Sequence, residues 1–457
     1  MASRPGHASP ARVDQKLAPT ISSLSSWPAG LQRPLDWAVG RRYELVALVL
    51  YAFVLVARAP WVLVLGRFWA EEATVHLAYA WNHSFLDALT APQFGYCNLV
   101  ANVAAIIASR VPLESAPRFT TALALLVQLI PAAMILFTSI PALSTPLRKV
   151  GALLLLLVAP ANPDVYLNSI NSQSVLCSAA GIILISEPGG RADRCGKWVV
   201  LGVAGLSGVA TTFLAPLFWV QWWLERRRDR LTQALVLSAC ALLQFVFISR
   251  GIAHEQRHLR FSSTALVGAA YGKFIAMPLM PTRPANLQLA QLRQNAEETG
   301  ALPGWVWFAT AAGCAAFLLV CWRSGNRAAM LLAAATLWVA LLSLCGSRDA
   351  TSDLNLLAHI TSAHRYYYAP QCFFLLALLA SLGPRTSLPP ALRVFGALWL
   401  GAALLVGMVN FACGPLEWPS IFSGPAWSSQ VEQWRKDPSK PLAVWPAGWQ
   451  FSLPSKP

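Results

Sequence analysis

Two adjacent carboxylates, Glu71 and Glu72, follow the first long apolar segment of the chain. The sequence is 56% hydrophobic and only 12% charged, so a pair of carboxylates at the end of an apolar run needs an explanation. Adjacent carboxylates repel each other, and partial burial raises the pKa of at least one of them. Such a group can take a proton from a hydroxyl as a general base. One of the two could instead cap the helix that follows, where negative charge is favourable.

A helix that begins at this pair would place a histidine on the same face as Glu72. His76 follows Glu72 by four residues and Tyr79 follows His76 by three, which are the spacings of neighbours on a helix surface. Two roles are open for His76, a second proton-transfer group or a hydrogen-bonding partner in the substrate site.

A second cluster, His364-Arg365-Tyr366, opens a later apolar segment. The planar guanidinium of Arg365 suits phosphate oxygens, which predicts a phosphate contact at the membrane boundary. His364 and Tyr366 would line a groove for lipid or sugar beside it. The alternative is an interfacial anchor, because Tyr and Arg collect at that depth in many membrane proteins.

Two further polar groups could bind a substrate. Asp164 and Asn171 belong to an amide-rich stretch at the edge of an apolar segment, which suits sugar hydroxyls but also suits a capped turn. Lys273 and Arg283 lie in a long connecting segment. Their charges could hold a phosphate or diphosphate head group, or could be ordinary solvated charges.

The elements that must position these residues are membrane helices. The mean hydropathy of +0.50 and the long apolar runs indicate an all-α polytopic membrane protein rather than a soluble domain. We expect about eleven transmembrane helices, within a range of 10–13. The expected spans lie near 43–64, 118–139, 148–161, 172–187, 197–211, 212–225, 231–250, 304–322, 328–346, 366–383 and 393–411, and the segment 197–225 is expected to break near Thr211-Thr212.

The distribution of charge predicts the orientation. The net charge of +15 is concentrated in short gaps between apolar runs, such as Arg148-Lys149 and Arg226-Arg227-Arg228, which favours the positive-inside rule over nucleic-acid binding. This places the N-terminus in the cytoplasm, with residues 1–42 as a disordered tail and 43–411 as the transmembrane domain. Outside lie a first loop at 65–117, a long loop at 251–303 and a Trp-rich tail at 412–457. The stretch 95–110 is expected to be an amphipathic helix on the outer surface.

The sequence contains no Gly-rich phosphate loop and no zinc-ligand spacing. Every expected inner loop is too short for a nucleotide-binding domain. An enzyme of this kind would therefore take an activated substrate from the membrane or from the outer side.

Several motifs together resemble the GT-C superfamily of membrane glycosyltransferases. They are Trp69-Ala70-Glu71-Glu72, Gly95-Tyr96, Pro112-Leu113-Glu114-Ser115-Ala116-Pro117-Arg118, His364-Arg365-Tyr366-Tyr367-Tyr368-Ala369-Pro370, Trp434-Arg435 and Val444-Trp445-Pro446-Ala447-Gly448-Trp449. In architecture the resemblance covers most of the chain, and it is closest to an uncharacterised bacterial group. That group more often carries Glu-Asp where this chain has Glu-Glu, which leaves open whether Glu71 or Glu72 acts.

The resemblance implies an inverting transfer of a sugar from a polyprenyl-phosphate donor to an acceptor hydroxyl on a glycan, lipid or protein. It implies that Glu71 or Glu72 is the catalytic carboxylate, that Arg365 binds the donor phosphate, and that Tyr96 belongs to the substrate site. The protein would reside in a bacterial cytoplasmic (inner) membrane with its C-terminus in the periplasm. No cofactor is required by this scheme. Some members use a divalent cation such as Mg²⁺ or Mn²⁺, for which Glu71, Glu72 and Asp164 would be the oxygen ligands.

The rival interpretations are a membrane transporter or a flippase for lipid or glycan, and a non-catalytic membrane scaffold. A transport pathway would favour buried charges in the middle of spans. Arg58 is the clearest charged residue within an expected span, and it lies near the outer end, where its long side chain can reach the boundary.

Overall fold

The structure, a computed structural model, describes residues 41–158, 163–253, 262–345, 364–384, 386–413 and 423–454. It is mostly helical (77%). The chain divides into two units, Met1–Ala47 and Leu48–Pro457, and all the site residues discussed below belong to the second. The cytoplasmic tail expected at 1–42 lies outside the described residues, apart from its last two positions.

Within the described ranges, four helices are long and apolar enough to cross a membrane. A helix rises about 1.5 Å per residue, so roughly 20 residues cross a hydrocarbon layer of about 30 Å. Their length and composition indicate an all-α membrane protein. They are α7 (Ala116–Phe137), α13 (Arg228–Ala253), α17 (Gly304–Arg323) and α20 (Pro390–Cys413).

The other predicted apolar segments are also helical, but each is shorter. The segment predicted to break near Thr211-Thr212 breaks on both sides of that pair. Helix α10 ends at Leu206 and α11 begins after Gly208, whose φ of +143° favours glycine, and α11 ends at Thr212 before α12 begins at Ala215. These shorter elements are α2 (Arg42–Arg58), α3 (Trp61–Leu65), α8 (Pro146–Val158), α9 (Ser172–Ile185), α10 (Arg191–Leu206), α11 (Val209–Thr212), α12 (Ala215–Glu225), α18 (Arg327–Cys345) and α19 (Tyr368–Ser381).

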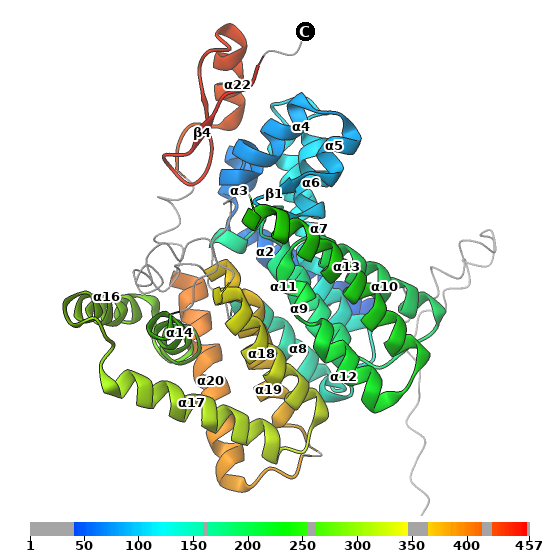
Figure 1. Ribbon diagram of the computed structural model, residues 1–457, viewed down its shortest axis with the longest axis vertical. Coiled ribbons are helices and arrows are strands. Elements are labelled where there is room, and N and C mark those ends of the chain that lie inside the picture. Colours follow the sequence, from blue (N-terminus) through cyan, green and yellow to red (C-terminus); the bar gives the residue numbers. More distant parts are fainter. Residues whose placement is uncertain are drawn as a thin grey trace, which may run out of the picture. The chain divides into compact units, whose positions relative to one another are not determined.

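Helices α9 and α19 form the centre of the packing (Figure 1). Both are apolar on all sides, as expected for helices surrounded by protein, and nearly every residue of each is buried. Helix α9 packs against α7, α10 and α19, and α19 packs against α8, α18 and α20. Gly181 permits the close contact between them, because a Cβ there would lie 2.1 Å from the ring of Phe373. Their N-terminal ends carry the polar segments of the candidate site.

The first loop, expected at 65–117, folds into short helices and a small hairpin. Helix α6 differs from the one-sided surface helix expected at 95–110. Most of its ten residues are buried, including Asn102, because small alanines let α7 and the neighbouring short helices approach closely. In order, the elements are η2 (a π-helix, Glu72–Leu77), α4 (Ala78–Asn82), α5 (Phe85–Thr90), β1 (Pro92–Gln93), β2 (Tyr96–Cys97) and α6 (Leu99–Ala108).

The described part of the long loop contains α14 (Ser263–Ala270), the π-helix η5 (Tyr271–Ala276), α15 (Met277–Leu279) and α16 (Thr282–Thr299). Helix α16 is amphipathic. Its apolar stripe of Ala285, Leu289, Leu292 and Ala296 is buried in one cluster with Tyr271 and Met277, while the other faces are polar.

The C-terminal tail contains α22 (Trp427–Lys436) and a two-stranded antiparallel hairpin of β3 (Leu442–Ala443) and β4 (Gln450–Phe451). Its Trp427 and Trp434 share a buried cluster with Phe68, Leu77 and Leu113 of the first loop. Three short 3-10 helices complete the described elements: η3 (Pro141–Leu143), η4 (Pro163–Val165) and η7 (His364–Tyr366).

Candidate functional site

Residues 163–174, which lead into α9, connect groups that are far apart in the sequence. Ser169 binds Glu72 of the first loop, and Ser174 binds the backbone of Arg365 before α19. Asp164 interacts electrostatically with Lys273 of the long loop. The segment therefore connects Glu72 with the backbone of Arg365 and with the charge of Lys273.

Glu72 is buried and fully engaged in hydrogen bonds. Its Oε1 accepts from the backbone N–H and the hydroxyl of Ser169, at 3.0 and 2.5 Å, and its Oε2 accepts from the N–H of Trp69 at 3.1 Å. Burial raises the pKa of Glu72, and these hydrogen bonds, with one from Thr120, act in the opposite direction. This carboxylate ties the first loop to the segment before α9.

Glu71 differs from its neighbour. It is half-buried and stands at the N-terminus of the π-helix η2. No hydrogen bond or ion pair engages its carboxylate within the described part of the chain. Glu71 is therefore the carboxylate of the pair that remains accessible to a substrate.

His76 is buried in the first loop and bonded to Asn102. Its Nδ1 lies 2.9 Å from Asn102 Oδ1, and the Asn102 amide group donates to the carbonyls of Leu89 and Ala91, both at 3.0 Å. Because that amide nitrogen is the donor, Oδ1 is the acceptor and the network assigns the proton to Nδ1. Burial lowers the pKa of His76 to about 4, so the ring is neutral at pH 7. Its position suits a structural hydrogen bond.

Lys273 is buried within the second π-helix, η5, with an exposed fraction of 2%. Its ammonium lies 5.8 Å from the ring centre of Tyr367. Burial lowers the pKa of Lys273 to about 7, and the charge of Asp164 partly offsets that shift. An anion close to Lys273 would favour its charged form, so a bound phosphate would raise the pKa of this lysine.

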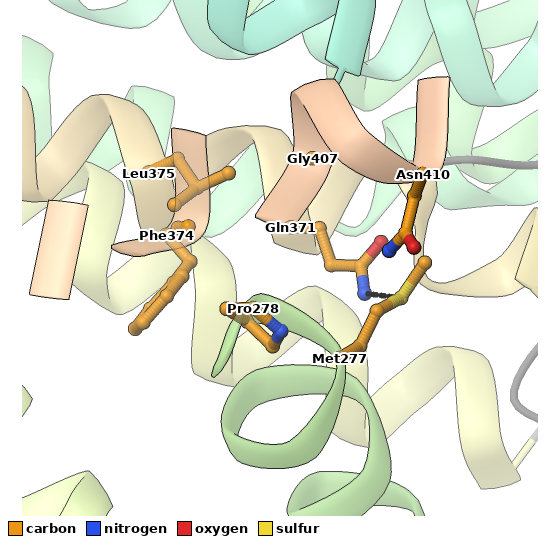
Figure 2. Close-up of a pocket in the computed structure, with 8 residues that line it drawn as sticks. Met277, Pro278, Gln371, Phe374, Leu375, Gly407 and Asn410 are labelled. Atoms are coloured by element: carbon orange, nitrogen blue, oxygen red, sulfur yellow. Dashed lines mark hydrogen bonds between the residues drawn. The ribbon is translucent and has the colours of Figure 1, made fainter. Parts of the chain in front are cut away.

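A small cavity is lined by Met277 and Pro278 of α15, which follows η5, and by Gln371 and Asn410 (Figure 2). Gln371 of α19 donates from Nε2 to the carbonyl of Lys273 at 2.9 Å and to Sδ of Met277 at 3.0 Å. Asn410 of α20 also lines the cavity, and its Oδ1 accepts from the N–H of Thr282 at 3.0 Å. The amides of two apolar helices thus hold the backbone of the long loop.

Arg365 lies in η7, which contacts η4. Arg365 is half-buried, its guanidinium lies 5.2 Å from the ring centre of Tyr366, and its carbonyl accepts from the hydroxyl of Ser174 at 2.7 Å. Tyr366 is half-buried as well. The side chain of His364 lies outside the described residues.

The amides of the stretch predicted to bind sugar make hydrogen bonds within their own loop. Asn168 and Asn171 both donate from Nδ2 to the carbonyl of Asp164, at 2.5 and 2.6 Å, and the N–H of Asn171 donates to Asn168 Oδ1 at 3.0 Å. This arrangement follows the alternative of a capped turn. The half-buried carboxylate of Asp164 is the part of this loop that interacts with Lys273.

The remaining two predicted residues, Tyr96 and Arg283, differ in whether they contact the other candidates. Tyr96 joins the site, because its hydroxyl accepts from Nε2 of Gln173 at 3.2 Å. Arg283 is exposed at the start of α16, and in the described ranges no hydrogen bond or ion pair connects it with the other candidates.

Sequence reasoning missed several residues that fix the site, above all Ser169, Asn102 and Trp445. Ser169 belongs to the polar stretch at the start of α9, so its position offered a signal. Asn102 interrupts an apolar run, which is a sign of a buried hydrogen bond. Trp445 lies in one of the motifs named above, but its contact with Trp69, more than 370 positions away, has no local signal in the sequence.

No protein-family model matches this chain, and no curated protein matches it.

Proposed function

We propose that this protein is a GT-C-type membrane glycosyltransferase that moves a sugar from a polyprenyl-phosphate donor to an acceptor hydroxyl with inversion. The observation that best supports the proposal is the convergence on residues 163–174. Glu72, the neighbour of the accessible Glu71, binds Ser169 of this segment, the carbonyl of Arg365 binds Ser174, and the charge of Asp164 acts on Lys273. A base and cations are the groups that such a displacement needs.

In the proposed reaction, Glu71 takes the proton of the acceptor hydroxyl. The acceptor oxygen then attacks the anomeric carbon from the face opposite the phosphate, and the bond between that carbon and the phosphate oxygen breaks. The polyprenyl phosphate leaves as an anion, and the charges of Arg365 and Lys273 stabilise it. A single displacement of this kind inverts the configuration at the anomeric carbon.

Glu72 has a supporting role in this proposal. Its hydrogen bonds to Ser169 and Trp69 fix the backbone directly beside Glu71. The oxygen of a general base must lie within about 2.6–3.2 Å of the oxygen that carries the proton, so a rigid neighbour is valuable.

Glu72 is not available as a ligand for the possible divalent cation, because both of its oxygens already accept hydrogen bonds from Trp69 and Ser169. In the part of the chain that the structure describes, there is no group of three His, Cys, Asp or Glu residues that could hold a metal ion.

The wider proposal keeps the expected arrangement of about eleven membrane segments, with the N-terminus in the cytoplasm and the site on the outer face of a bacterial inner membrane. Arg58 gives little support to the transporter alternative. The guanidinium of Arg58 lies 4.6 and 4.4 Å from the ring centres of Tyr166 and Phe411, and these cation–π contacts connect α2 with α20 and with the segment before α9.

The test is sugar transfer from a polyprenyl-phosphate donor by the purified protein and its variants Glu71→Gln and Arg365→Ala. We expect Glu71→Gln to lower kcat by roughly 10²–10⁴-fold. Asp87→Asn, an exposed carboxylate of the same loop, is the matched control and should retain activity. Full activity in both Glu71→Gln and Arg365→Ala would refute the mechanism.

A further inference from the structure

The C-terminal tail pairs with the backbone just before Glu71. The N–H of Trp445 donates to the carbonyl of Phe68 at 2.9 Å, and the N–H of Ala70 donates to the carbonyl of Trp445. Trp445 thereby forms a parallel bridge with Trp69. The last backbone hydrogen bond of this bridge is one residue away from Glu71.

A second contact fixes the same stretch from its other end. The carbonyl of Ser423 accepts from Nη1 of Arg67 at 2.6 Å and from Nε1 of Trp445 at 3.2 Å. The start of the described tail and its hairpin therefore meet at one oxygen. Residues 67–70 are held by the tail on both sides.

The tail itself is firmly packed on the first loop. Trp427 is buried, donates from Nε1 to the carbonyl of Leu113 at 2.7 Å, and meets the ring of Phe68 edge to face with centres 5.2 Å apart. Trp434 donates from Nε1 to the carbonyl of Leu453 at 3.2 Å. Two tryptophans bury a large apolar area, so this contact can resist displacement.

Glu71 depends on its backbone for its position. In the described residues no hydrogen bond orients its carboxylate, in contrast to Glu72. The backbone after it is fixed by Glu72 and Ser169, and the backbone before it is fixed by the tail. A misplacement of about 1 Å can lower a rate about 10²-fold, so both supports matter to a base.

We infer that Trp445 is a positioning residue. Through Trp445, the tail at 423–454 holds the backbone before Glu71 so that the carboxylate can reach the acceptor hydroxyl. The inference rests on the proposed function, because it assigns the tail a part in that reaction. Trp445 does not touch the reacting atoms. Its effect passes through the backbone of Trp69 and Ala70.

The experiment compares Trp445→Ala and Trp445→Phe with Trp449→Ala in the full-length protein. Trp449 belongs to the same hairpin turn but its side chain is 41% exposed, which makes it a matched control. We measure kcat and KM for the donor in sugar transfer, and amide hydrogen exchange across residues 67–72 and 99–108. Exchange reports the contact whether or not transfer is observed.

We expect Trp445→Ala to lower kcat by about 10–100-fold with the donor KM changed less than about two-fold, since positioning acts on the transition state. Exchange should become faster at 67–72 and stay the same at 99–108. Trp445→Phe keeps an aromatic ring and should recover most of kcat, while Trp449→Ala should match the parent protein.

Unchanged kcat in Trp445→Ala, or a raised KM with unchanged kcat, would overturn the positioning role and leave the proposed reaction intact. Full transfer by Glu71→Gln would instead remove the proposed base. If Trp445→Ala cannot be purified in folded form, Arg67→Gln decides the question, because it removes the hydrogen bond from Arg67 to the carbonyl of Ser423 and leaves Trp445 in place. A several-fold lower kcat supports the role, and parent-like kcat overturns it.

Discussion

The π-helices η2 and η5 hold their ionisable side chains in opposite ways. In η2, Glu72 uses both carboxylate oxygens in hydrogen bonds to Trp69 and Ser169. In η5, Gln371 binds the backbone carbonyl of Lys273. The ammonium of Lys273 lies 5.8 Å from the ring centre of Tyr367, and the charge of Asp164 raises its pKa. π-helices are rare and occur frequently at functional sites.

The difference separates two kinds of contribution. A buried group with every oxygen satisfied stabilises one arrangement of the chain, which suits Glu72 as a support for Glu71. A buried cation whose pKa lies near 7 gains most when an anion arrives, which suits Lys273 as a phosphate contact. Substitutions in and beside the two π-helices can test whether Glu72 supports the structure and Lys273 contacts the phosphate.

The largest effect is expected at the accessible carboxylate beside the first π-helix. Glu71→Gln should lower kcat by roughly 10²–10⁴-fold, because the amide cannot accept the proton. Its melting temperature should stay close to that of the parent protein. Steady-state kinetics with thermal unfolding checks this, and a large loss of folding with normal kcat would reverse the assignment of Glu71 and Glu72.

The second π-helix should show its effect in binding and in pH dependence. Lys273→Met should lower kcat/KM for the donor by about 10–100-fold, the range of a charge-assisted contact. The pKa of Lys273 is about 7 in the folded protein and higher when unfolded, so the unfolded state binds more protons between these values. The free energy of unfolding should therefore rise with pH above about 7, by up to about 1.4 kcal/mol per unit, and the variant should lose this slope.

The matched control for that measurement is Arg283→Gln, which removes an exposed cation from the same loop. It should alter neither kcat/KM nor the pH slope. An equal effect of the two substitutions would show that general positive charge, and not the buried position of Lys273, determines donor binding.

Glu72→Gln should mainly reduce stability. Its amide nitrogen cannot accept the hydrogen bonds from Trp69 or Ser169, and an unsatisfied buried group costs about 1–3 kcal/mol. Thermal or denaturant unfolding measures the change. Glu114→Gln, which breaks a partly exposed ion pair with Arg435, should cost at most about 1 kcal/mol. Unchanged stability in Glu72→Gln would contradict the supporting role.

At neutral pH the smallest effect on stability is expected from the charge state of His76, which should change only at acid pH. Burial holds its pKa at about 4, below the ordinary 6.5, so the unfolded state binds more protons between these values. The protein should lose up to about 1.4 kcal/mol of stability per unit as pH falls from about 6.5 to about 4. His76→Gln should lose this dependence, whereas the exposed His83→Gln should keep it. A pH limb in kcat that disappears in His76→Gln would instead favour proton transfer by His76.

Apolar composition predicted the helices well because each such segment carries its own signal. Helices α7, α13, α17 and α20 could be recognised from continuous apolar runs. The buried α6 was predicted less well, since a short run with Asn98 and Asn102 looks like a surface helix. Asn98 donates to the carbonyl of Ile170 before α9, and Asn102 donates to the carbonyl of Leu89 in the same loop, so distant and local partners satisfy these amides.

The sequence by itself determined that the chain is helical and that several helices suit a membrane. It also indicated Glu71, Glu72, Lys273 and Arg365 as candidate site residues. These conclusions depend on residue type and local spacing. Only the tertiary structure distinguished Glu71 from Glu72 and joined the tail to Trp69. The physical reason is that burial and hydrogen bonding are set by partners such as Ser169 and Trp445, which are distant in the sequence and become neighbours only when the helices pack.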